Sequence, residues 1–263
     1  MHKLSLKRWN EGVLQAWERP ALAFLAAHMP GRVSPDLLTG IGVAGALLAA
    51  VSYALSGSHP ALLWLATLGL AINWFGDSLD GTVARLQKIE RPRYGYYLDN
   101  AIDCFIALPV AIGLGFSGYI RFDICFLSLS LYTMISALTF LRANVTDVFQ
   151  ISYSGLGPTE MRVATALLSA LIYFRPPAAF DFAGVVLKYP DVIALAWCLT
   201  AFISFLACMI MQVRQLALEE PRRRGELSIR EAAERARLSQ SGANGAGDAL
   251  AAGQTGAQTA GGI

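Results

Sequence analysis

The chain has 263 residues, of which 55% are hydrophobic and only 15% are charged, and its formal net charge is +2. A composition this apolar, with a mean hydropathy of +0.47, favours an integral membrane protein over a soluble domain. The near-neutral charge offers no basic surface for nucleic acid, and the cysteines and histidines have no spacing typical of a metal site or a disulfide framework.

Residues 1–33 predict a helix that lies in the membrane interface. Leu6, Trp9 and Trp17 recur at helical spacing, charged residues occupy other positions, and Pro20 interrupts the pattern. Tryptophan side chains are typical of the headgroup level of a bilayer, which favours this interpretation over a helix that binds a partner protein. The segment lacks the apolar core and the cleavage pattern of a signal peptide.

Residues 34–214 predict an all-α transmembrane domain. Its apolar segments are each long enough, or nearly so, to cross a hydrocarbon core of ~30 Å with ~20 residues. The six predicted spans are residues 37–55, 61–79, 96–118, 122–141, 158–174 and 191–213. Residues 215–263 begin with charged residues and then become rich in Gly, Ala, Gln and Ser, which predicts a largely disordered tail.

The distribution of Lys and Arg predicts the orientation of the spans. Positive residues collect in the N-terminal segment, in the link at residues 85–93 and at the start of the tail, which all fall on one side of a six-span bundle. Because positive loops favour the cytoplasm, both termini and this link are expected to be cytoplasmic in a multi-pass membrane protein.

The segment from Asp77 to Asp103 places four aspartates where two of these spans meet. One stripe of the first helix combines two acids with two small residues: Asp77, Asp80, Gly81 and Ala84. Asp99 and Asp103, four residues apart, form a second stripe on the next helix, which runs antiparallel after a short basic link. If the stripes face each other, four carboxylates converge at the cytoplasmic end of the bundle.

Four converging carboxylates would repel one another and could not all stay ionised. Two divalent cations, Mg²⁺ or Mn²⁺, would balance their charge and leave positions for phosphates. A pair of such ions stabilises the attacking and leaving oxygens in a displacement at phosphorus. Gly81 and Ala84 would let a phosphorylated ligand approach the helix, and the Arg85 guanidinium can neutralise a diphosphate.

Two other interpretations remain open at this point. The acids could cap helices or pair with the basic residues of the link, although this explains neither stripe. A cation channel or proton-coupled transporter could also carry paired aspartates in a bundle. A transporter would not require Gly81, Ala84 and Arg85 at their positions, and it would favour aspartates at mid-depth.

The same residues resemble a known signature. "DSLDGTVAR" (Asp77–Arg85) followed by "GYYLDNAID" (Gly95–Asp103) is similar to the motif of the CDP-alcohol phosphotransferases, Asp-x-x-Asp-Gly-x-x-Ala-Arg and then Gly-x-x-x-Asp-x-x-x-Asp. Every fixed position is present. The link between Arg85 and Gly95 has one residue more than is common, so a longer loop and an intact pocket are expected. The resemblance covers roughly Trp17 to Val213.

The resemblance implies a role for each motif residue. The two metals would be held by Asp77, Asp80, Asp99 and Asp103, and Asp103 would also be the general base. The cytidine diphosphate part of the donor would bind to Gly81, Ala84 and Arg85, together with Pro35 and Thr39 at the start of the first span. A homodimer is implied by the family alone.

The implied activity is that of a transferase of substituted phosphate groups in phospholipid biosynthesis. A substituted phosphate would pass from a CDP-linked donor to an alcohol hydroxyl, and CMP would leave. The preferred donor is CDP-diacylglycerol, with a small polar alcohol as acceptor. The reverse assignment, with CDP-choline or CDP-ethanolamine as donor and a lipid alcohol as acceptor, remains open.

Acceptor selection is the least determined part of the site. "GLGPTEMR" (Gly155–Arg162) resembles a run in some choline- and ethanolamine-phosphotransferases and places Glu160 and Arg162 at the cytoplasmic mouth. Arg142 and Asn144, at the end of the fourth span, face the same side. The simplest interpretation of Glu160 is a first-turn acid favoured by the helix dipole.

Overall fold

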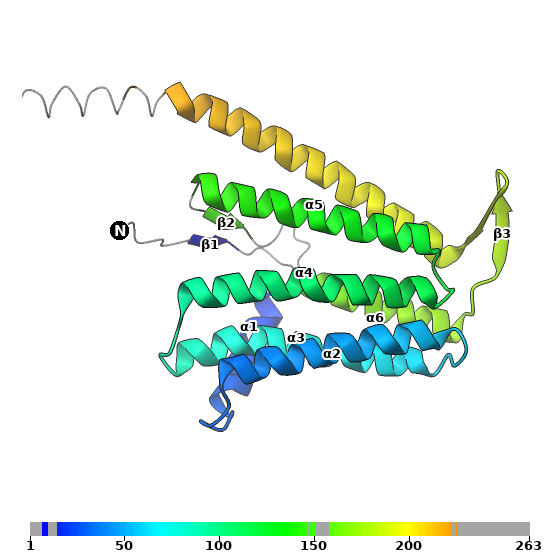
Figure 1. Cartoon of the computed structure of the whole chain (residues 1–263), viewed down its shortest axis with the longest axis horizontal. Helices are drawn as coiled ribbons and strands as arrows, with labels where there is room; N and C mark the ends of the chain where they lie inside the picture. Colours follow the sequence, from blue (N-terminus) through cyan, green and yellow to red (C-terminus); the bar gives the residue numbers. More distant parts are fainter. Residues whose placement is uncertain (1–6, 10–14, 147, 151–157, 222–224, 226–263) are drawn as a thin grey trace, which may run out of the picture. The chain divides into compact units, whose positions relative to one another are not determined.

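The computed structural model of the chain describes residues 7–9, 15–146, 148–150, 158–221 and 225, and it is mostly helical (Figure 1). The chain divides into two compact units, Met1–Ala207 and Cys208–Ile263. The motif residues all belong to the first unit. The prediction of an all-α protein therefore holds for most of the described residues.

The described residues contain seven helices and two pairs of short strands. The helices are α1 (Gln15–Ala27), α2 (Pro35–Ser56), α3 (Leu62–Leu86), α4 (Pro92–Phe116), α5 (Phe122–Thr146), α6 (Pro158–Phe174) and a long final helix (Tyr189–Pro221). The strands are β1 (Lys7–Trp9), parallel to β2 (Val148–Gln150), and β3 (Ala179–Phe182), antiparallel to β4 (Val185–Lys188).

Among the described residues, five helices are long and apolar enough to cross a membrane, which makes the chain a multi-pass membrane protein. They are α2, α3, α4, the Phe122–Arg142 part of α5 and the final helix. The remaining predicted span forms α6, but its 17 residues at ~1.5 Å each give only about 26 Å. The sixth span therefore stays a prediction. The final helix extends beyond residue 214, where the tail was expected to begin.

The N-terminal segment differs in part from its prediction. Helix α1 begins at Gln15 and continues through Pro20, whereas residues 7–9, expected to be helical, form strand β1. Proline removes one backbone hydrogen bond from a helix. Leu22 and Ala26 stabilise α1 in spite of this loss, because they are buried in a cluster with side chains of α2 and α3. Leu6 lies outside the described residues.

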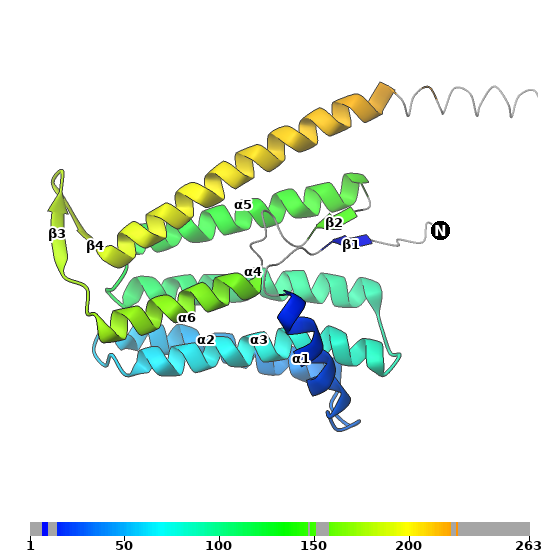
Figure 2. The same ribbon diagram turned by 180° about the vertical axis from the view of Figure 1, so that it is seen from behind.

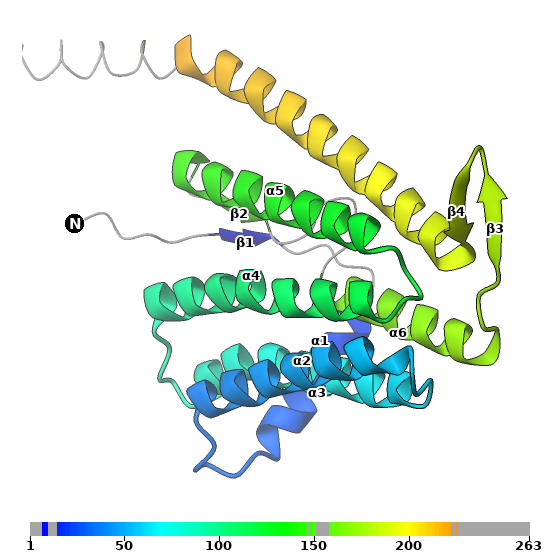
Figure 3. The same ribbon diagram turned by 45° about the vertical axis from the view of Figure 1, so that its right-hand side comes forward.

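The link after α6 contains a β-hairpin that the sequence analysis did not predict. Its two turn residues, Ala183 and Gly184, both have positive φ angles, of 54° and 81°, as a two-residue hairpin turn requires. The buried Asp191 accepts hydrogen bonds from the backbone N–H groups of Arg121 (2.7 Å) and Lys188 (2.8 Å) and so anchors the hairpin. Figure 3 shows the hairpin at the end of α6 remote from the α3–α4 link.

Helices α2 and α3 approach each other through glycines. A Cβ atom at Gly45 would lie 2.7 Å from the backbone O of Gly69, and one at Gly69 would lie 2.7 Å from the backbone O of Gly45. Gly76 packs in the same way against Gly42. Small residues of this kind let two helix backbones come close in a membrane. The contact fixes the motif half of α3 against the first turns of α2.

The first turn of α2 is capped by the residue that precedes it. Ser34 is the N-cap, with its Oγ accepting from Leu37 N at 3.2 Å, and Pro35 occupies the first helical position. Further along, α2 packs against α4 as well as α3. Helix α2 therefore contacts both of the helices that carry the motif aspartates.

Candidate active site

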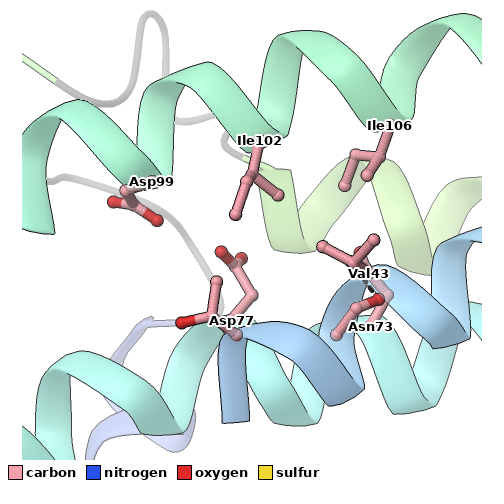
Figure 4. Close-up of a pocket in the computed structure, with 8 residues that line it drawn as sticks. Val43, Asn73, Asp77, Asp99, Ile102 and Ile106 are labelled. Atoms are coloured by element: carbon pink, nitrogen blue, oxygen red, sulfur yellow. Dashed lines mark hydrogen bonds between the residues drawn. The ribbon is translucent and has the colours of Figure 1, made fainter. Parts of the chain in front are cut away.

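Asp77 and Asp99 project from α3 and α4 into the same space (Figure 4). They line a small cavity of about 10 Å³, close to the room that one water molecule needs. The other lining residues are Thr39, Gly42, Val43, Asn73, Ile102 and Ile106. The two helical stripes predicted from the sequence therefore face each other at this point.

Arg162 of α6 connects aspartates of two different helices. Its Nη2 donates to Asp77 Oδ2 at 2.8 Å and lies 3.9 Å from Asp103 Oδ1. The Arg162 side chain is only 13% exposed, and the two carboxylate side chains are 24% and 25% exposed. Charges withdrawn from water in this way require close partners. One guanidinium thus holds a motif residue of α3 and a motif residue of α4 together.

Asp80 is held by a residue of the first predicted span. Thr39 Oγ1 donates to Asp80 Oδ2 at 2.6 Å, and the backbone N–H of Gly81 donates to Asp80 Oδ1. The Thr39 hydroxyl also lies 3.1 Å from the carbonyl O of Pro35. The Pro35–Thr39 turn of α2 therefore lies against the motif, and its role in donor binding stays a prediction.

The small-residue side of the motif faces open space. A Cβ atom at Gly81 would meet no heavy atom within 4 Å except those of the Arg85 guanidinium, the nearer at 3.4 Å. Arg85 itself is exposed, and its Nη2 donates to Thr82 Oγ1 at 3.1 Å. Ala84 is partly buried on the same helix. A flat or phosphorylated ligand can approach α3 closely on this side.

The donor set is suited to a hard divalent cation. All four motif aspartates are partly buried and offer only oxygen ligands, which Mg²⁺ and Mn²⁺ prefer. Within the described residues, no three Asp, Glu, His or Cys side chains come close enough together to hold one ion. Arg162 and Thr39 instead contact three of the four carboxylates: Asp77, Asp80 and Asp103. The metal assignment therefore remains a proposal.

Comparison with known proteins identifies the family. The sequence model described as CDP-alcohol phosphatidyltransferase matches residues 32–202. The chain belongs to this family. The match contains both halves of the aspartate motif, the Pro35–Thr39 turn and Arg162.

Two curated proteins are similar to part of this chain. The chain is 33% identical over 105 residues to an archaetidylinositol phosphate synthase of Pyrococcus horikoshii, which is 40% of this chain and 52% of the relative. It is 35% identical over 116 residues to a phosphatidylinositol phosphate synthase of Cutibacterium acnes, which is 43% of this chain and 51% of the relative. The chain thus spans about half the length of the curated relatives it matches.

The α3–α4 link, which is one residue longer than is common in the family motif, forms a tight turn anchored to α2. Lys88 adopts a positive φ of 56°, and Arg91 precedes the first helical residue of α4, Pro92. Arg91 Nη2 donates to both carboxylate oxygens of Asp36, at 2.6 and 2.8 Å. This hydrogen-bonded pair raises the pKa of Arg91. The additional residue therefore sits in a link that is tied to the start of α2.

The remaining predicted residues keep their roles as predictions. Glu160 is in the first turn of α6, two residues before Arg162, and is partly buried. Arg142 is partly buried near the end of α5. The side chain of Asn144 lies outside the described residues.

Glu18 of α1 contacts the site, although its position in the sequence did not mark it as a site residue. Glu18 Oε1 accepts hydrogen bonds from Trp74 Nε1, Ser78 Oγ and Thr159 Oγ1. Ser78 directly follows Asp77, so α1 reaches the motif itself. The only sequence signal was an acid in the first turn of α1, which the helix dipole explains equally well.

Proposed function

We propose that this chain transfers a phosphatidyl group from CDP-diacylglycerol to a hydroxyl of inositol phosphate and releases CMP. The observation that carries this proposal is the pairing of Asp77 and Asp103 through Arg162, inside an intact motif of the family. The relatives, an archaetidylinositol phosphate synthase and a phosphatidylinositol phosphate synthase, support the choice of inositol phosphate as acceptor. They also favour a CDP-linked lipid over CDP-choline or CDP-ethanolamine as donor.

Asp103 acts as the general base in this proposal. Its carboxylate takes the proton from the acceptor hydroxyl as that oxygen attacks the phosphorus that carries diacylglycerol. A new phosphorus–oxygen bond forms, and the bond from this phosphorus to the oxygen of CMP breaks. Arg162 contacts Asp77 and lies near Asp103, so it keeps the base oriented during the attack. Negative charge develops on the phosphate oxygen of CMP as this leaving group departs.

Asp77, Asp80, Asp99 and Asp103 would hold two Mg²⁺ or Mn²⁺ ions. Bound there, the ions would neutralise the diphosphate and the charge that develops during transfer. The chain itself contributes the open side of α3 at Gly81 and Ala84, where the diphosphate can lie against the helix. The exposed Arg85 guanidinium can bind it through a forked pair of hydrogen bonds.

The nucleotide end of the donor binds beside the first turn of α2. Pro35 and Thr39 lie there, and the hydrogen bond from Thr39 to Asp80 joins this turn to the motif. On the acceptor side, Arg162 and Arg142 supply positive charge that suits a phosphate group on the acceptor. Glu160 and Asn144 complete the proposed acceptor side.

The proposed topology has six spans, with both termini and the α3–α4 link in the cytoplasm. The positive residues of the link and of the tail support this orientation. The charged donor and acceptor would then reach the aspartates from the cytoplasmic side. A homodimer is proposed from family membership alone.

The test uses the full-length protein, purified in detergent and supplied with CDP-diacylglycerol and Mg²⁺. Inositol 1-phosphate, serine, glycerol 3-phosphate and choline are offered in turn, and CMP and the lipid product are identified. We expect CMP and a phosphatidylinositol phosphate only with inositol 1-phosphate, and none after EDTA treatment.

A different lipid product would correct the acceptor and leave the reaction class in place. A parallel assay offers CDP-choline with diacylglycerol, and CMP release in this assay alone would favour the reverse assignment of donor and acceptor. No CMP release with any donor would contradict the proposed function.

A further inference from the structure

Glu18 connects three helices through one carboxylate oxygen. Its Oε1 accepts from Trp74 Nε1 at 2.7 Å, from Ser78 Oγ at 3.1 Å and from Thr159 Oγ1 at 3.1 Å. Trp74 and Ser78 belong to α3, and Thr159 belongs to the first turn of α6. Figure 2 shows α1 crossing α3 beside the start of α6. An ionised carboxylate only accepts hydrogen bonds, so all three partners donate to it.

These contacts lie directly beside the Arg162 ion pair. Ser78 follows Asp77 on α3, and Thr159 precedes Arg162 by about one helical turn on α6. Two consecutive residues of α3 are therefore bound to the start of α6: Ser78 is joined to Thr159 through Glu18, and Asp77 is bound by Arg162. A shift of α6 by one residue, ~1.5 Å along its axis, would break both connections together.

A second path leads from Glu18 toward Arg85. The backbone O of Ser78 accepts from Thr82 Oγ1 at 3.1 Å, and Thr82 Oγ1 in turn accepts from Arg85 Nη2 at 3.1 Å. The carboxylate of Glu18 therefore stands at the start of a hydrogen-bonded row along α3. This row ends at the guanidinium proposed to bind the donor diphosphate.

We propose that Glu18 is a positioning residue for the transfer reaction. Its carboxylate holds the first turn of α6 against α3, which keeps the Arg162 guanidinium between Asp77 and Asp103. Glu18 contacts Trp74, Ser78 and Thr159 rather than the reacting groups, so it acts through its neighbours. The interfacial helix then becomes part of the catalytic apparatus. This inference rests on the proposed function.

The first test compares Thr159→Val with Thr159→Ser in the full-length protein. Valine keeps the shape of threonine and removes the hydroxyl that donates to Glu18, whereas serine keeps the hydroxyl. CMP release is measured with CDP-diacylglycerol and inositol 1-phosphate. For Thr159→Val we expect kcat to fall about tenfold while the KM for the donor changes less than about twofold. Thr159→Ser should keep most of the wild-type kcat.

Glu18→Gln provides the second variant, because its amide oxygen still accepts hydrogen bonds but carries no charge. We expect a smaller fall in kcat than for Glu18→Ala. The matched control is Glu219→Gln, which removes an exposed carboxylate from the final helix and should leave kcat unchanged. Equal kcat values for Thr159→Val and wild type, or equal losses for the valine and serine variants, would overturn the inference.

A double-mutant cycle tests the Glu18–Thr159 contact without any activity measurement. Thermal unfolding is followed for Glu18→Ala, Thr159→Val and the double variant, because both single changes remove the hydrogen bond between these residues. If the two residues interact, the double variant loses less stability than the sum of the losses in the two single variants. We expect this result. Additive changes would overturn the inference even if the protein is active. Wild-type protein that releases no CMP with any donor, but shows the coupling, would instead contradict the proposed function alone.

Discussion

At the scale of single residues, Arg162 does most to organise the aspartates. It joins Asp77 and Asp103 across two helices although 85 positions separate Arg162 from Asp77 in the sequence. The motif spacing predicted two aspartate stripes, one on each helix. The spacing gave no information about which cation lies between the aspartates of α3 and α4. Residue spacing describes the face of one helix, and Arg162 belongs to a third helix, α6.

Asp103→Asn tests the proposed base directly. The amide cannot take a proton from the acceptor, so we expect CMP release to fall by about 10²–10⁴-fold. The measurement is initial-rate CMP release, with thermal unfolding followed in parallel. The control is Asp123→Asn, at the far end of the bundle, where the carboxylate is 64% exposed and forms a salt bridge with Arg121. Wild-type rates in Asp103→Asn would contradict the assignment.

Arg162→Met leaves Asp77 and Asp103 without their shared cation. We expect the free energy of unfolding to fall by on the order of 2 kcal/mol, less than for a fully buried pair because the carboxylates keep some contact with water. Added Mn²⁺ should restore part of this loss, since a bound cation supplies the missing charge. Thermal unfolding with and without Mn²⁺ measures both effects. The exposed Arg121→Met is the control, and equal stability of the two variants would count against the ion pair.

At the scale of elements, the α2–α3 contact decides where the motif lies. Glycines bring these helices close enough for Thr39 of α2 to reach Asp80 of α3. Backbone atoms face one another at Gly45 and Gly69, so no side chain there can move aside. The site is therefore built on a contact between two backbones, and its geometry depends on residues that carry no chemistry.

Gly45→Ala and Gly40→Ala form a matched pair on α2. The new Cβ at residue 45 would lie 2.7 Å from backbone atoms of α3, whereas the one at residue 40 would meet nothing within 4 Å. We expect Gly45→Ala to lower the free energy of unfolding by about 1–3 kcal/mol through overpacking. Gly40→Ala should raise it by up to ~1 kcal/mol, because alanine is the better helix former. Thermal unfolding separates them, and the reverse order would refute the argument.

The sequence was sufficient for long helices and insufficient for short elements and distant contacts. Apolar runs of span length predicted α2 to α5 because hydrophobicity and length alone decide such segments. The β3–β4 hairpin was missed because it depends on the positive φ angles of Ala183 and Gly184 and on anchoring by Asp191. Glu18 was missed because its partner Thr159 is 141 positions away. Such pairs come together through the packing of different helices, and the periodicity within one helix does not predict that packing.

At the scale of the whole molecule, the orientation in the membrane is the principal untested prediction. The α3–α4 link and the β3–β4 hairpin lie at different ends of the helices of the first unit (Figure 3). In the proposed topology the link faces the cytoplasm and the hairpin faces the opposite side. Access of the charged substrates to the aspartates depends on this assignment.

Single cysteines at Glu90 and Asp181 test the orientation, in a background in which the four native cysteines are replaced by alanine. Both positions are exposed, the first in the link and the second in the hairpin. In intact cells we expect a membrane-impermeant maleimide to label Asp181→Cys and to label Glu90→Cys only after permeabilisation. Labelling in the opposite pattern would invert the topology.

The glycine contact between α2 and α3 also bears on how this sequence can vary. When two side chains collide, a smaller residue at the neighbouring position can relieve the collision. At Gly45 and Gly69 the nearest neighbours are main-chain atoms, which every amino acid retains. A larger residue there therefore has no simple second-site suppressor on the opposite helix. In a library of variants, these positions should accept glycine almost alone, while Gly40 on the same helix accepts many residues.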